Sequence, residues 1–551
     1  MLPTIIVFYF AIPTTSFGQN PSQLMLSQMN DIQYDCSLPS CSLPTILTAS
    51  SLINCQIFCL KSSDCRTLTF DQLSNQCLVF SNHPSHDGSL TTQIGSITMI
   101  AIDQRAVIAS TATSSTSSTS STATTSTTST TALYYVPTSL WRFDNTTLDS
   151  LSNLNGVGVN SPAFKVPGIN GRAALSLTRS QNQYVTISTY QNFTYTSFTI
   201  EMWIYINSLS GGNTFGLFSQ RENATTNHLL ISFIWNNHLA LSFYSNDVIG
   251  STTLSLYAWY HATLVYDYPS RTQAVYLNGY QDGIHTSADP YLGTVGAITI
   301  GMFNDSTNAV QAFDGYIDEV SLTMRSKNAT EILNDATLTT YHSFDSIPFV
   351  DSGPLALGVI ASGVNLVTGR VNQSLNFTTN SSYYQVSGFV LLGVSNQPFS
   401  FALWTKRTTT AGGATLVHMS TLMNGTGWCV DWLGFSSSGQ IVATGWNSMG
   451  YQVVGPVFST NVWTHVVSTY SPTNGLRLYV NGTLMGTADT RTYNASEQVN
   501  ILTLGNPLKG LNGTSCNSMA IVTTPYIGYL DEFYVYSREL SGADVLALAN
   551  P

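Results

Sequence analysis

Two pairs of neighbouring acids are the residues in this sequence most suggestive of chemistry, Asp318-Glu319 and Asp531-Glu532. Each pair stands in a phrase that alternates large and polar residues, which predicts a strand with one buried face. Neighbours on a strand point to opposite faces, so the two acids of a pair are not expected to act together on one bond. We therefore expect a structural role, in which one acid bonds to the backbone or to the Ser-Arg tail that follows.

Glu201 is a further acid that has to be weighed for catalysis. Hydrolysis of a glycosidic bond needs two carboxylates on either side of that bond. No predicted strand carries carboxylates at positions i and i+2. A similar segment later in the sequence has Ala402 at the position that corresponds to Glu201, so it lacks this acid. We expect no catalytic residues, so the protein is not predicted to be an enzyme.

His261 and His465 each follow a tryptophan by two residues and share its strand face. No second metal ligand is spaced near either histidine, so a packed, hydrogen-bonded imidazole is favoured over a base or a metal ligand. The sequence contains two similar halves, and four tryptophans occupy matching positions in them, which favours core packing for these residues: Trp203, Trp259, Trp404 and Trp463. Four others are unmatched and are better candidates for exposed stacking surfaces, although core packing is favoured even there: Trp235, Trp428, Trp432 and Trp446.

The elements that position these residues come from a long internal repeat. Phrases recur in the same order at nearly constant spacing, and the spacing widens only in a loop before the closing phrase, as in two diverged copies of one fold. The matched phrases are Phe143-Asp144 with Phe344-Asp345, Phe198–Trp203 with Phe399–Trp404, Trp259–His261 with Trp463–His465, Tyr276–Gly279 with Tyr479–Gly482, and Phe313–Val320 with Tyr526–Phe533.

Within each copy, short alternating runs lie between Gly, Asn, Asp and Ser turns. In residues 198–206, Phe198, Ile200, Met202, Ile204 and Ile206 fall on one face, and Phe399, Phe401 and Leu403 repeat this pattern. Asn278-Gly279 and Asn481-Gly482 predict tight hairpin turns, because this pair suits positive φ values. Short helical tails are expected after Arg325-Ser-Lys327 and Ser537-Arg-Glu539. The fold class is mainly β, with two tandem antiparallel β-sandwich jelly rolls over 137–335 and 339–549.

This ordered set of phrases, together with Gly171-Arg172 and Gly369-Arg370, resembles the laminin-G-like, concanavalin A-like jelly roll of secreted proteins. The resemblance implies binding of glycans or glycoproteins, sometimes assisted by Ca²⁺ at a rim of the sandwich. Glucanases share this jelly roll, which is why Glu201 is the position to weigh as a glycosidase acid.

The rim loops before the closing strands, 302–312 and 506–525, differ most between the copies. Asp305 offers one carboxylate for Ca²⁺, whereas a complete site needs several converging oxygens. Cys429 and Cys516 occur only in the second copy, and we expect a disulfide that presses the long loop onto the strand carrying Trp428 and Trp432. Our hypothesis is that this rim faces the ligand in the second copy, and that the first copy binds differently or not at all.

Six cysteines cluster near the N-terminus, in a module too small to be stabilised by a core alone. A helix over 51–59 would put Cys55 and Cys59 on one face, and Cys65, a strand at Leu68–Phe70 and Cys77–Phe80 follow. This spacing resembles the PAN/apple module, a small disulfide-rich α+β fold placed at 30–105. The resemblance implies Cys55–Cys77 and Cys59–Cys65 bridges and binding of proteins or carbohydrates. Cys36 and Cys41 lie close together upstream and are expected to pair locally.

Residues 1–18 read as a secretory signal peptide, with a short apolar run and cleavage after Gly18. Residues 109–132 are almost purely Ser, Thr and Ala, which predicts a disordered linker of the O-glycosylated, mucin-like kind or a plain spacer. An even number of cysteines and many Asn-X-Ser/Thr sequons fit an extracellular glycoprotein. The sequons are Asn145, Asn192, Asn223, Asn304, Asn328, Asn372, Asn376, Asn380, Asn424, Asn481, Asn494 and Asn512.

Charged residues make up only 9% of the 551 residues and the net charge is −11, too few cations to neutralise a run of phosphates. Nucleic acid is therefore excluded as a partner, and no later segment is apolar enough to insert the mature chain in a membrane. We expect a secreted, extracellular binding or adhesion protein for glycans or glycoproteins. The alternatives are a structural matrix or coat glycoprotein and, less favoured, a glycoside-processing enzyme.

Overall fold

The structure is a computed structural model of the whole chain. It describes the backbone of residues 4–8, 24–35, 45–48, 67–71, 76–80, 89–102, 137–409, 412–489, 491–508 and 516–551. Before residue 137, side chains are described only for residues 67–71 and 76–80. The chain divides into two compact units, Met1–Ser126 and Thr127–Pro551, and each is described by itself.

The N-terminal unit contains one six-stranded antiparallel sheet. Its strands are β1 (Thr4–Phe8), β2 (Leu24–Asp35), β3 (Thr45–Thr48), β4 (Thr67–Asp71), β5 (Gln76–Phe80) and β6 (Ser89–Ile102), in the order β1-β2-β6-β4-β5-β3. The two predicted strands are confirmed as β4 and β5, and Cys77 on β5 is disulfide-bonded. The predicted helix and linker lie outside the described residues, as do Cys36, Cys41, Cys55, Cys59 and Cys65. Strand β1 lies inside the predicted signal peptide, whose cleavage stays a prediction.

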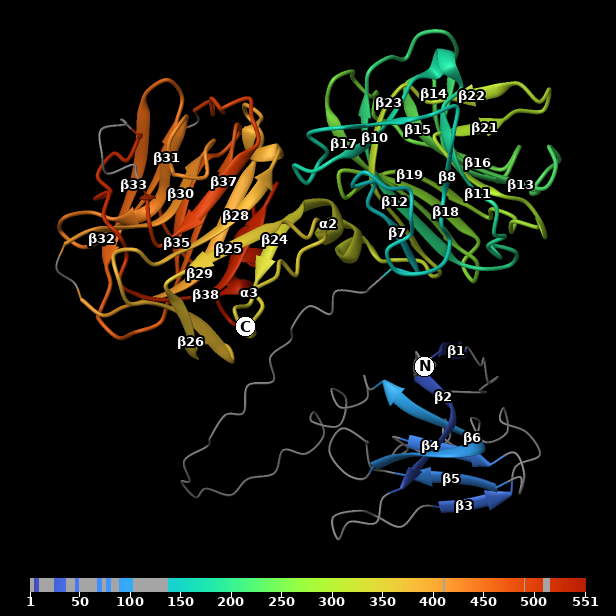
Figure 1. Cartoon of the computed structure of the whole chain (residues 1–551), viewed down its shortest axis with the longest axis horizontal. Helices are drawn as coiled ribbons and strands as arrows, with labels where there is room; N and C mark the ends of the chain where they lie inside the picture. The colour runs from blue at the N-terminus through green and yellow to red at the C-terminus, as the bar shows by residue number, and fades with distance from the viewer. Residues whose placement is uncertain are drawn as a thin grey trace, which may run out of the picture. The chain divides into compact units, whose positions relative to one another are not determined.

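The first copy of the repeat is a β-sandwich of two antiparallel sheets (Figure 1, cyan to yellow-green). Its strands are β7 (Ser139–Trp141), β8 (Val157–Val159), β9 (Ala163–Lys165), β10 (Ala174–Leu177), β11 (Tyr184–Ile187), β12 (Phe198–Ile206), β13 (Thr214–Arg221), β14 (Leu229–Trp235), β15 (His238–Ser242), β16 (Asp247–Ile249), β17 (Trp259–Asp267), β18 (Thr272–Leu277), β19 (Tyr280–Thr286), β20 (Ile298–Ile300), β21 (Met302–Asn304), β22 (Val310–Ala312) and β23 (Gly315–Thr323). One sheet has the order β19-β18-β17-β12-β23-β10-β9 with β7 on β23, the other β16-β15-β14-β13-β20-β11-β8, and β21 pairs with β22.

The second copy repeats the topology of the two sheets but has no counterpart of the β21–β22 hairpin among its described strands (Figure 1, yellow to red). Its strands are β24 (Leu338–His342), β25 (Gly358–Ser362), β26 (Val364–Thr368), β27 (Gln373–Phe377), β28 (Tyr383–Phe389), β29 (Phe399–Arg407), β30 (Ala414–Ser420), β31 (Cys429–Phe435), β32 (Gln440–Trp446), β33 (Gly450–Val457), β34 (Thr464–Ser471), β35 (Gly475–Val480), β36 (Thr483–Thr487), β37 (Asn500–Leu504) and β38 (Gly528–Tyr536). The orders are β26-β27-β38-β29-β34-β35-β36 with β24 on β38, and β25-β28-β37-β30-β31-β32-β33. Two tandem jelly rolls are therefore confirmed.

The alternating face predicted for β12 forms the middle of the first core. Phe198, Ile200, Met202, Ile204 and Ile206 are fully buried, and each such side chain stabilises the fold by about 1.5–3 kcal/mol. The predicted hairpin turns are confirmed as well, because Asn278-Gly279 and Asn481-Gly482 all have positive φ. Each asparagine side chain also accepts a hydrogen bond from the backbone of the neighbouring strand's histidine, His261 or His465.

A β-bulge interrupts both closing strands at the acid pairs. The register between β12 and β23 shifts at this point, and Glu319 has a left-handed φ of 47°. The extra residue breaks the alternation, so Asp318 and Glu319 both lie between the core residues Ile317 and Val320 and reach the same loop. The prediction that the two acids point to opposite faces is therefore wrong. Glu532, with φ 50°, repeats the bulge in β38.

The structural role predicted for one acid of each pair is confirmed. Asp318 Oδ2 accepts a hydrogen bond from Ile169 N (2.9 Å), and Asp531 Oδ2 accepts from Arg370 N (2.7 Å). A Cβ on Gly168 would lie 2.4 Å from Asp318 Oδ2, and one on Gly369 would lie 2.5 Å from Asp531 Oδ2. Gly168 is therefore the structural counterpart of Gly369, so the sequence match of Gly171 with Gly369 is wrong.

The predicted helical tails are α2 (Ala329–Thr337) and α3 (Gly542–Leu548), each opened by a capping box. Two short 3₁₀ turns, η2 (Arg179–Gln181) and η3 (Leu391–Gly393), complete the secondary structure of the described part of the C-terminal unit. Among the described residues, the helices are all too short or too polar to cross a bilayer.

Candidate functional site

The outward face of β12 carries Thr199, Glu201 and Trp203, which are as buried as its core face. The β12–β17 pairing puts Trp203 opposite His261, and the β12–β23 pairing puts Glu201 opposite Ser321. Chain segments outside the sheet cover this face, among them helix α2 and a segment of the second copy around Leu355, and Leu140 on β7 lies beside them. Sequence alternation could not show this cover, because it comes from distant parts of the chain.

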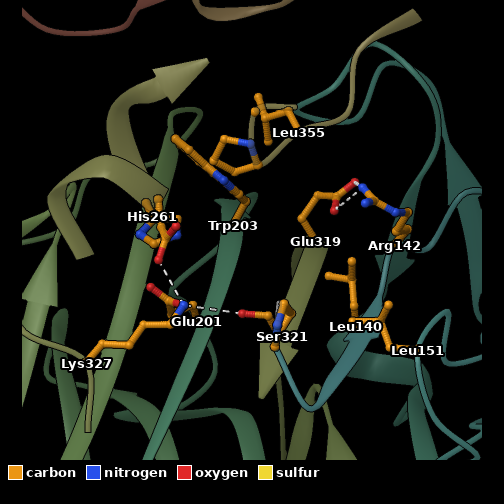
Figure 2. Close-up of a pocket in the computed structure, with 14 residues that line it drawn as sticks. Leu140, Arg142, Leu151, Glu201, Trp203, His261, Glu319, Ser321, Lys327 and Leu355 are labelled. Carbon is orange, nitrogen blue, oxygen red and sulfur yellow. Dashed lines mark hydrogen bonds and ion pairs between the residues drawn. The ribbon is translucent and has the colours of Figure 1, made fainter. Parts of the chain in front are cut away.

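The cover leaves a cavity of about 210 Å³, which we call the junction pocket. Its apolar wall comes from Leu140, Leu151, Trp203, Pro354 and Leu355, and its polar wall from Arg142, Glu201, His261, Glu319, Ser321, Lys327 and Asp335. Figure 2 shows the labelled side chains of strands β12, β17 and β23 around the pocket, with Lys327 reaching it from the segment after β23 and Leu355 from the second copy.

Lys327 stands between two carboxylates, and we call Glu201, Lys327 and Asp335 the charged triad. Lys327 Nζ donates to Glu201 Oε2 and, at 2.8 Å, to Asp335 Oδ2. Burial acts to lower the pKa of Lys327, but the two carboxylates outweigh it and the pKa is raised. Burial and the charge of Glu201 raise the pKa of Asp335 to about 6, against the attraction of Lys327.

The two carboxylate oxygens of Glu201 differ in their hydrogen bonds. Its Oε2 also accepts a hydrogen bond from Ser321 Oγ at 3.3 Å, as Figure 2 shows. Its Oε1 is buried and has no hydrogen-bond partner among the described residues. A buried acceptor without a donor is costly, and Glu201 Oε1 is too enclosed to be reached from the cavity.

Glu319 forms the second charged group of the pocket. Arg142 Nη1 donates to both of its oxygens, at 3.1 and 2.9 Å, and Asn170 Nδ2 donates at 2.7 Å. Burial raises the pKa of Glu319 to about 7, although Arg142 and Arg172 oppose the shift. Its oxygens are therefore engaged by the protein itself.

His261 is packed rather than open to chemistry. Its ring meets Trp203 edge to face at 5.1 Å, Nδ1 lies 3.3 Å from Thr263 Oγ1, and burial lowers its pKa to about 4. The prediction of a packed, hydrogen-bonded histidine is confirmed for this residue. His465 packs on Trp404 in the same way, but its buried Nδ1 lacks a hydrogen-bond partner among the described residues.

The second copy replaces the charged triad with apolar side chains. Thr199 Oγ1 accepts from Lys327 N and donates to Arg325 O, and Ser400 Oγ does the same with Leu540 N and Arg538 O. These repeated contacts align Lys327 with Leu540. Ala402 and Leu548 stand at the positions of Glu201 and Asp335. Ala402 and Leu540 belong to one buried apolar cluster, and the partly buried Leu548 packs against it.

Arg172 fastens the second-copy wall of the pocket. Its Nε donates to Asp144 at 2.6 Å, and its Nη1 donates to the backbone oxygen of Ala356 at 2.9 Å. Gly171 lies so close to the second copy that a Cβ would be 2.7 Å from the Cα of Gly388. The pocket is thus assembled from both copies.

A second hollow, of about 420 Å³, also lies between the copies. Trp203 lines it together with Trp259 and the exposed Tyr280, opposite Gln397 and Arg538. Sequence reasoning did not single out Tyr280. It also missed Arg142, Lys327 and Asp335; the signal that could have found the last two is that the second copy has leucines at their positions.

The tryptophan predictions divide by exposure. Core packing is confirmed for Trp203 and Trp404, which are buried, while Trp259 and Trp463 are partly exposed. Trp432 is fully buried in the second core, which confirms the favoured interpretation of core packing for this residue. Trp235, Trp428 and Trp446 are partly buried against the cores.

Asp305 structures the β21–β22 hairpin. Its carboxylate accepts hydrogen bonds from Thr307 N, Thr307 Oγ1, Ala309 N and Gln311 Nε2. These donors engage both oxygens of the carboxylate. Within the described ranges, no three His, Cys, Asp or Glu side chains group as a metal site. The described sequon asparagines are all at least partly exposed, and Asn512 lies outside the described residues.

The predicted Cys429–Cys516 disulfide is confirmed, with 4.9 Å between the Cα atoms. Cys516 and the residues after it follow β31: Asn517 O accepts from Asp431 N at 2.9 Å, and Ser518 Oγ donates to Asp431 Oδ2 at 2.6 Å. Both nitrogens of the buried His418 face acceptors, Asp431 Oδ1 and Gly425 O. The described part of the loop is therefore pinned to the strand, as predicted.

Comparison with known families identifies two domain types. The family described as "Concanavalin A-like lectin/glucanases superfamily" matches residues 179–333 and 378–546, together more than half of the chain. The PAN domain family matches residues 37–102, within the predicted module. A comparison with curated protein sequences finds no significant match.

Similar solved structures are distant. They include the binding domain of botulinum neurotoxin DC in complex with rat synaptotagmin II (16% identity, TM-score 0.30, 39% of this chain and 52% of that one). Another is domain 4 of an extracellular arabinanase from Geobacillus stearothermophilus in complex with arabinotriose (18% identity, TM-score 0.27, 38% and 98%). The chain thus spans about half of the neurotoxin domain. Likenesses at these TM-scores carry no argument about function.

Proposed function

The chain belongs to the concanavalin A-like lectin/glucanases superfamily, and on that premise we propose that it is a secreted, non-catalytic protein that binds glycans or extracellular glycoproteins. The family supports a binding role. The finer proposal concerns the ligand class, and the junction pocket is its site.

One observation carries the proposal: the charged triad stands where the second copy is apolar. Replacing a buried ion pair by well-packed apolar residues is often neutral or stabilising, by up to about 4 kcal/mol. The second copy shows that this fold accepts the apolar version. The triad in the first copy is therefore better explained by a ligand than by stability.

A binding role accounts for the pocket better than hydrolysis does. Glu319 is held by Arg142 and Asn170, and Asp335 by Lys327, so these carboxyl groups are engaged by neighbouring donors. Trp203 and Leu140 supply apolar wall, and Arg142 and Ser321 line the polar side. Binding sites commonly combine a mostly apolar wall with a few placed polar groups.

The experiment is a glycan array on the secreted, deglycosylated full-length protein, with and without Ca²⁺. Selective binding supports the proposal. Uniform silence would favour a structural matrix or coat protein, and release of sugar from the array would reveal a glycoside-processing enzyme. Comparison of the arms with and without Ca²⁺ tests whether the ion takes part.

Secretion and glycosylation are tested on the protein recovered from the medium of secretory cells. We expect its first residue to be Gln19, after cleavage at Gly18, and a loss of mass on removal of N-linked glycans. A chain that stays inside the cell with Met1 intact would contradict secretion.

The rim pinned by Cys429–Cys516 stays a second candidate binding face. Met449 and Met519 are exposed beside it, and the bridge holds the residues after Cys516 in place. The double variant Cys429→Ser/Cys516→Ser, tested on the same array, shows which of the two faces binds the ligand. Lost binding would assign the ligand to the rim, and unchanged binding leaves it at the junction pocket.

A further inference from the structure

The first copy uses one end of the outer face of its larger sheet to hold the second copy. Ile169 and Trp203 share one buried apolar cluster with Leu355 and Leu357 of the second copy, and Trp259 packs against that cluster. Trp259 also lines the hollow of about 420 Å³ between the copies. This end of the sandwich is therefore a surface on which the fold docks another protein domain.

The matching end of the second copy keeps the aromatic residues of this surface. Strand β29 pairs with β34 and β38 in the register in which β12 pairs with β17 and β23, so three residues correspond: Trp404 to Trp203, Trp463 to Trp259 and Tyr529 to Tyr316. The ring centroids of Trp463 and Tyr529 lie 6.3 Å apart, and both residues are partly exposed. This end of the second copy therefore presents rings that a partner can contact.

Arg370 is the first of two changes within this aromatic frame. Its backbone N donates to Asp531 Oδ2, as the backbone N of Ile169 does to the matching acid of the first copy. An exposed arginine thus stands where the first copy has an isoleucine buried against its neighbour. The guanidinium lies over the Trp404 ring, with Cζ 4.7 Å from the centroid. Burial raises the pKa of Asp531 to about 8, so this carboxyl is not a counter-charge for Arg370 at neutral pH.

Lys406 is the second change. Its Nζ lies between two rings, 5.0 Å from the centroid of Trp463 and 4.4 Å from that of Tyr529. The first copy has Tyr205 at this position of β12, stacked on Tyr316 at 5.3 Å. The ring faces hold an ammonium group by cation–π attraction without neutralising its charge. A tyrosine in an aromatic stack has therefore been replaced by a positioned cation.

The two cations are left for a partner to neutralise. Among the described residues, Arg370 and Lys406 make no ion pair, although the chain carries a net charge of −11. The cations around the junction pocket, by contrast, are all paired with carboxylates: Arg142, Arg172 and Lys327. A partner's carboxylates would find complementary charge at this end of the second copy, which favours association with an acidic surface.

The spacing of the cations suits an extended peptide. Trp404, which carries Arg370 over its ring, and Lys406 are two residues apart on β29 and share its outer face. Side chains on one face of an extended peptide also repeat every two residues, at about 6.5 Å. Acidic residues at positions i and i+2 of such a peptide can therefore meet both cations, while the atoms around them contact the rings.

We infer that a docking surface for an extended acidic segment of another protein lies on the second copy, and we call it the cationic face: Arg370, Trp404, Lys406, Trp463 and Tyr529. The inference goes beyond the proposed function, because the ligand is a polypeptide and the junction pocket takes no part. A peptide is favoured over a sulfated glycan because the matching end of the first copy docks a protein domain.

The test is fluorescence anisotropy of the full chain with a labelled peptide that alternates Glu and Ala. The same peptide with Gln or with Lys in place of Glu supplies the charge controls. The Glu peptide should bind with one site per chain and bind more weakly as NaCl is raised, because salt screens exposed charges. The Gln and Lys peptides should not bind.

Two variants remove the cations with little disturbance of the fold. Lys406→Tyr installs the residue that the first copy has in the same frame, and Arg370→Met keeps an unbranched stem over Trp404. Each should weaken binding of the Glu peptide by about tenfold, as loss of a charge-assisted hydrogen bond does, and make binding less dependent on salt. Lys165→Ala is the matched control, because it removes an exposed cation from β9 of the first copy, and it should bind like the wild type.

Unchanged binding of the Glu peptide in both variants would overturn the inference. Equal binding of the Gln peptide, or no binding of the Glu peptide at millimolar concentration, would overturn it as well. A heparin oligosaccharide is the last probe: if it binds, Lys406→Tyr weakens its binding and the Glu peptide stays unbound, the cations serve a sulfated glycan and the inference is wrong. The peptide titrations and the glycan array are independent, so failure of one leaves the other standing.

Discussion

The two jelly rolls share one topology, yet they differ in what lies outside their larger sheet. In the first copy the charged triad is buried there beside a cavity, whereas Ala402, Leu540 and Leu548 fill the same positions of the second copy. The cap contacts of Thr199 and Ser400 are the same in both. The comparison shows which features the fold requires and which one copy has added to it.

The second copy carries its own addition at a different place. Cys429–Cys516 pins residues after Cys516 along β31, and the first copy has no cysteines. In the first copy the matching rim is the short β21–β22 hairpin, held by Asp305. Each copy has thus been elaborated once, with charge in the first and a covalent bridge in the second.

The largest effect on stability should come from removing the cation of the charged triad while its two carboxylates remain. Lys327→Met leaves Glu201 and Asp335 buried and without their cation, which should lower the free energy of unfolding by about 3–5 kcal/mol. The control is Leu540→Met at the matching position of the second copy, where the cost should stay below about 1.5 kcal/mol. Urea unfolding measures both, and equal losses would break the comparison.

Removal of the bridge should come next in size. Cys429→Ser with Cys516→Ser opens a loop whose ends are 87 residues apart in sequence. The expected loss is about 2–4 kcal/mol, confined to the second copy, because hydrogen bonds of Asn517 and Ser518 remain. Hydrogen exchange resolved by peptide should show faster exchange in β31 and unchanged exchange in β14. Faster exchange in both copies would contradict separate elaborations.

A smaller effect should be shared by the copies, since both bury a neutral histidine. Burial lowers the pKa of His261 to about 4 and that of His465 to about 3. Between those pKa values and 6.5, the ordinary pKa of histidine, the unfolded chain binds more protons than the folded chain. The stability that the buried neutral histidines contribute is therefore fully present above pH 6.5 and decreases as the pH falls. The loss should be roughly 1–2 kcal/mol per histidine at pH 5 relative to pH 7.

This histidine effect is measured by urea unfolding at pH 7 and pH 5. His261→Gln and His465→Gln should each make the unfolding free energy less dependent on pH than in the wild type. A variant with the full wild-type dependence would show that its histidine is protonated in the folded protein.

Much of the fold followed from local patterns. The faces of β12 and the repeat follow from the side-chain period, and the Asn-Gly turns follow from turn chemistry. The Cys429–Cys516 bridge could be predicted because the repeat contains only these two cysteines. The bulge at Glu319 was missed, because alternation assumes a regular ladder. Gly171 was wrongly aligned with Gly369 because the position is defined by a contact that the sequence does not show. In that contact the carboxylate of Asp318 lies against Gly168.

The candidate site was foreseen only in part. Glu201, Trp203 and His261 were singled out by residue type, but Lys327 and Asp335 reach them from the tail and α2, and Leu355 from another domain. Such contacts are set by how distant segments pack, which periodicity within one strand does not contain. Comparing the copies position by position finds Lys327 and Asp335, since leucines replace both.

The central claim is that the charged triad serves a ligand and not the fold. The most direct measurement is urea unfolding of Glu201→Ala/Lys327→Leu/Asp335→Leu, together with its binding on the glycan array. We predict a triple variant as stable as the wild type, or more stable by about 1–4 kcal/mol, that no longer binds the glycans selected by the wild type. A loss of several kcal/mol in stability, or array binding equal to that of the wild type, would contradict the claim.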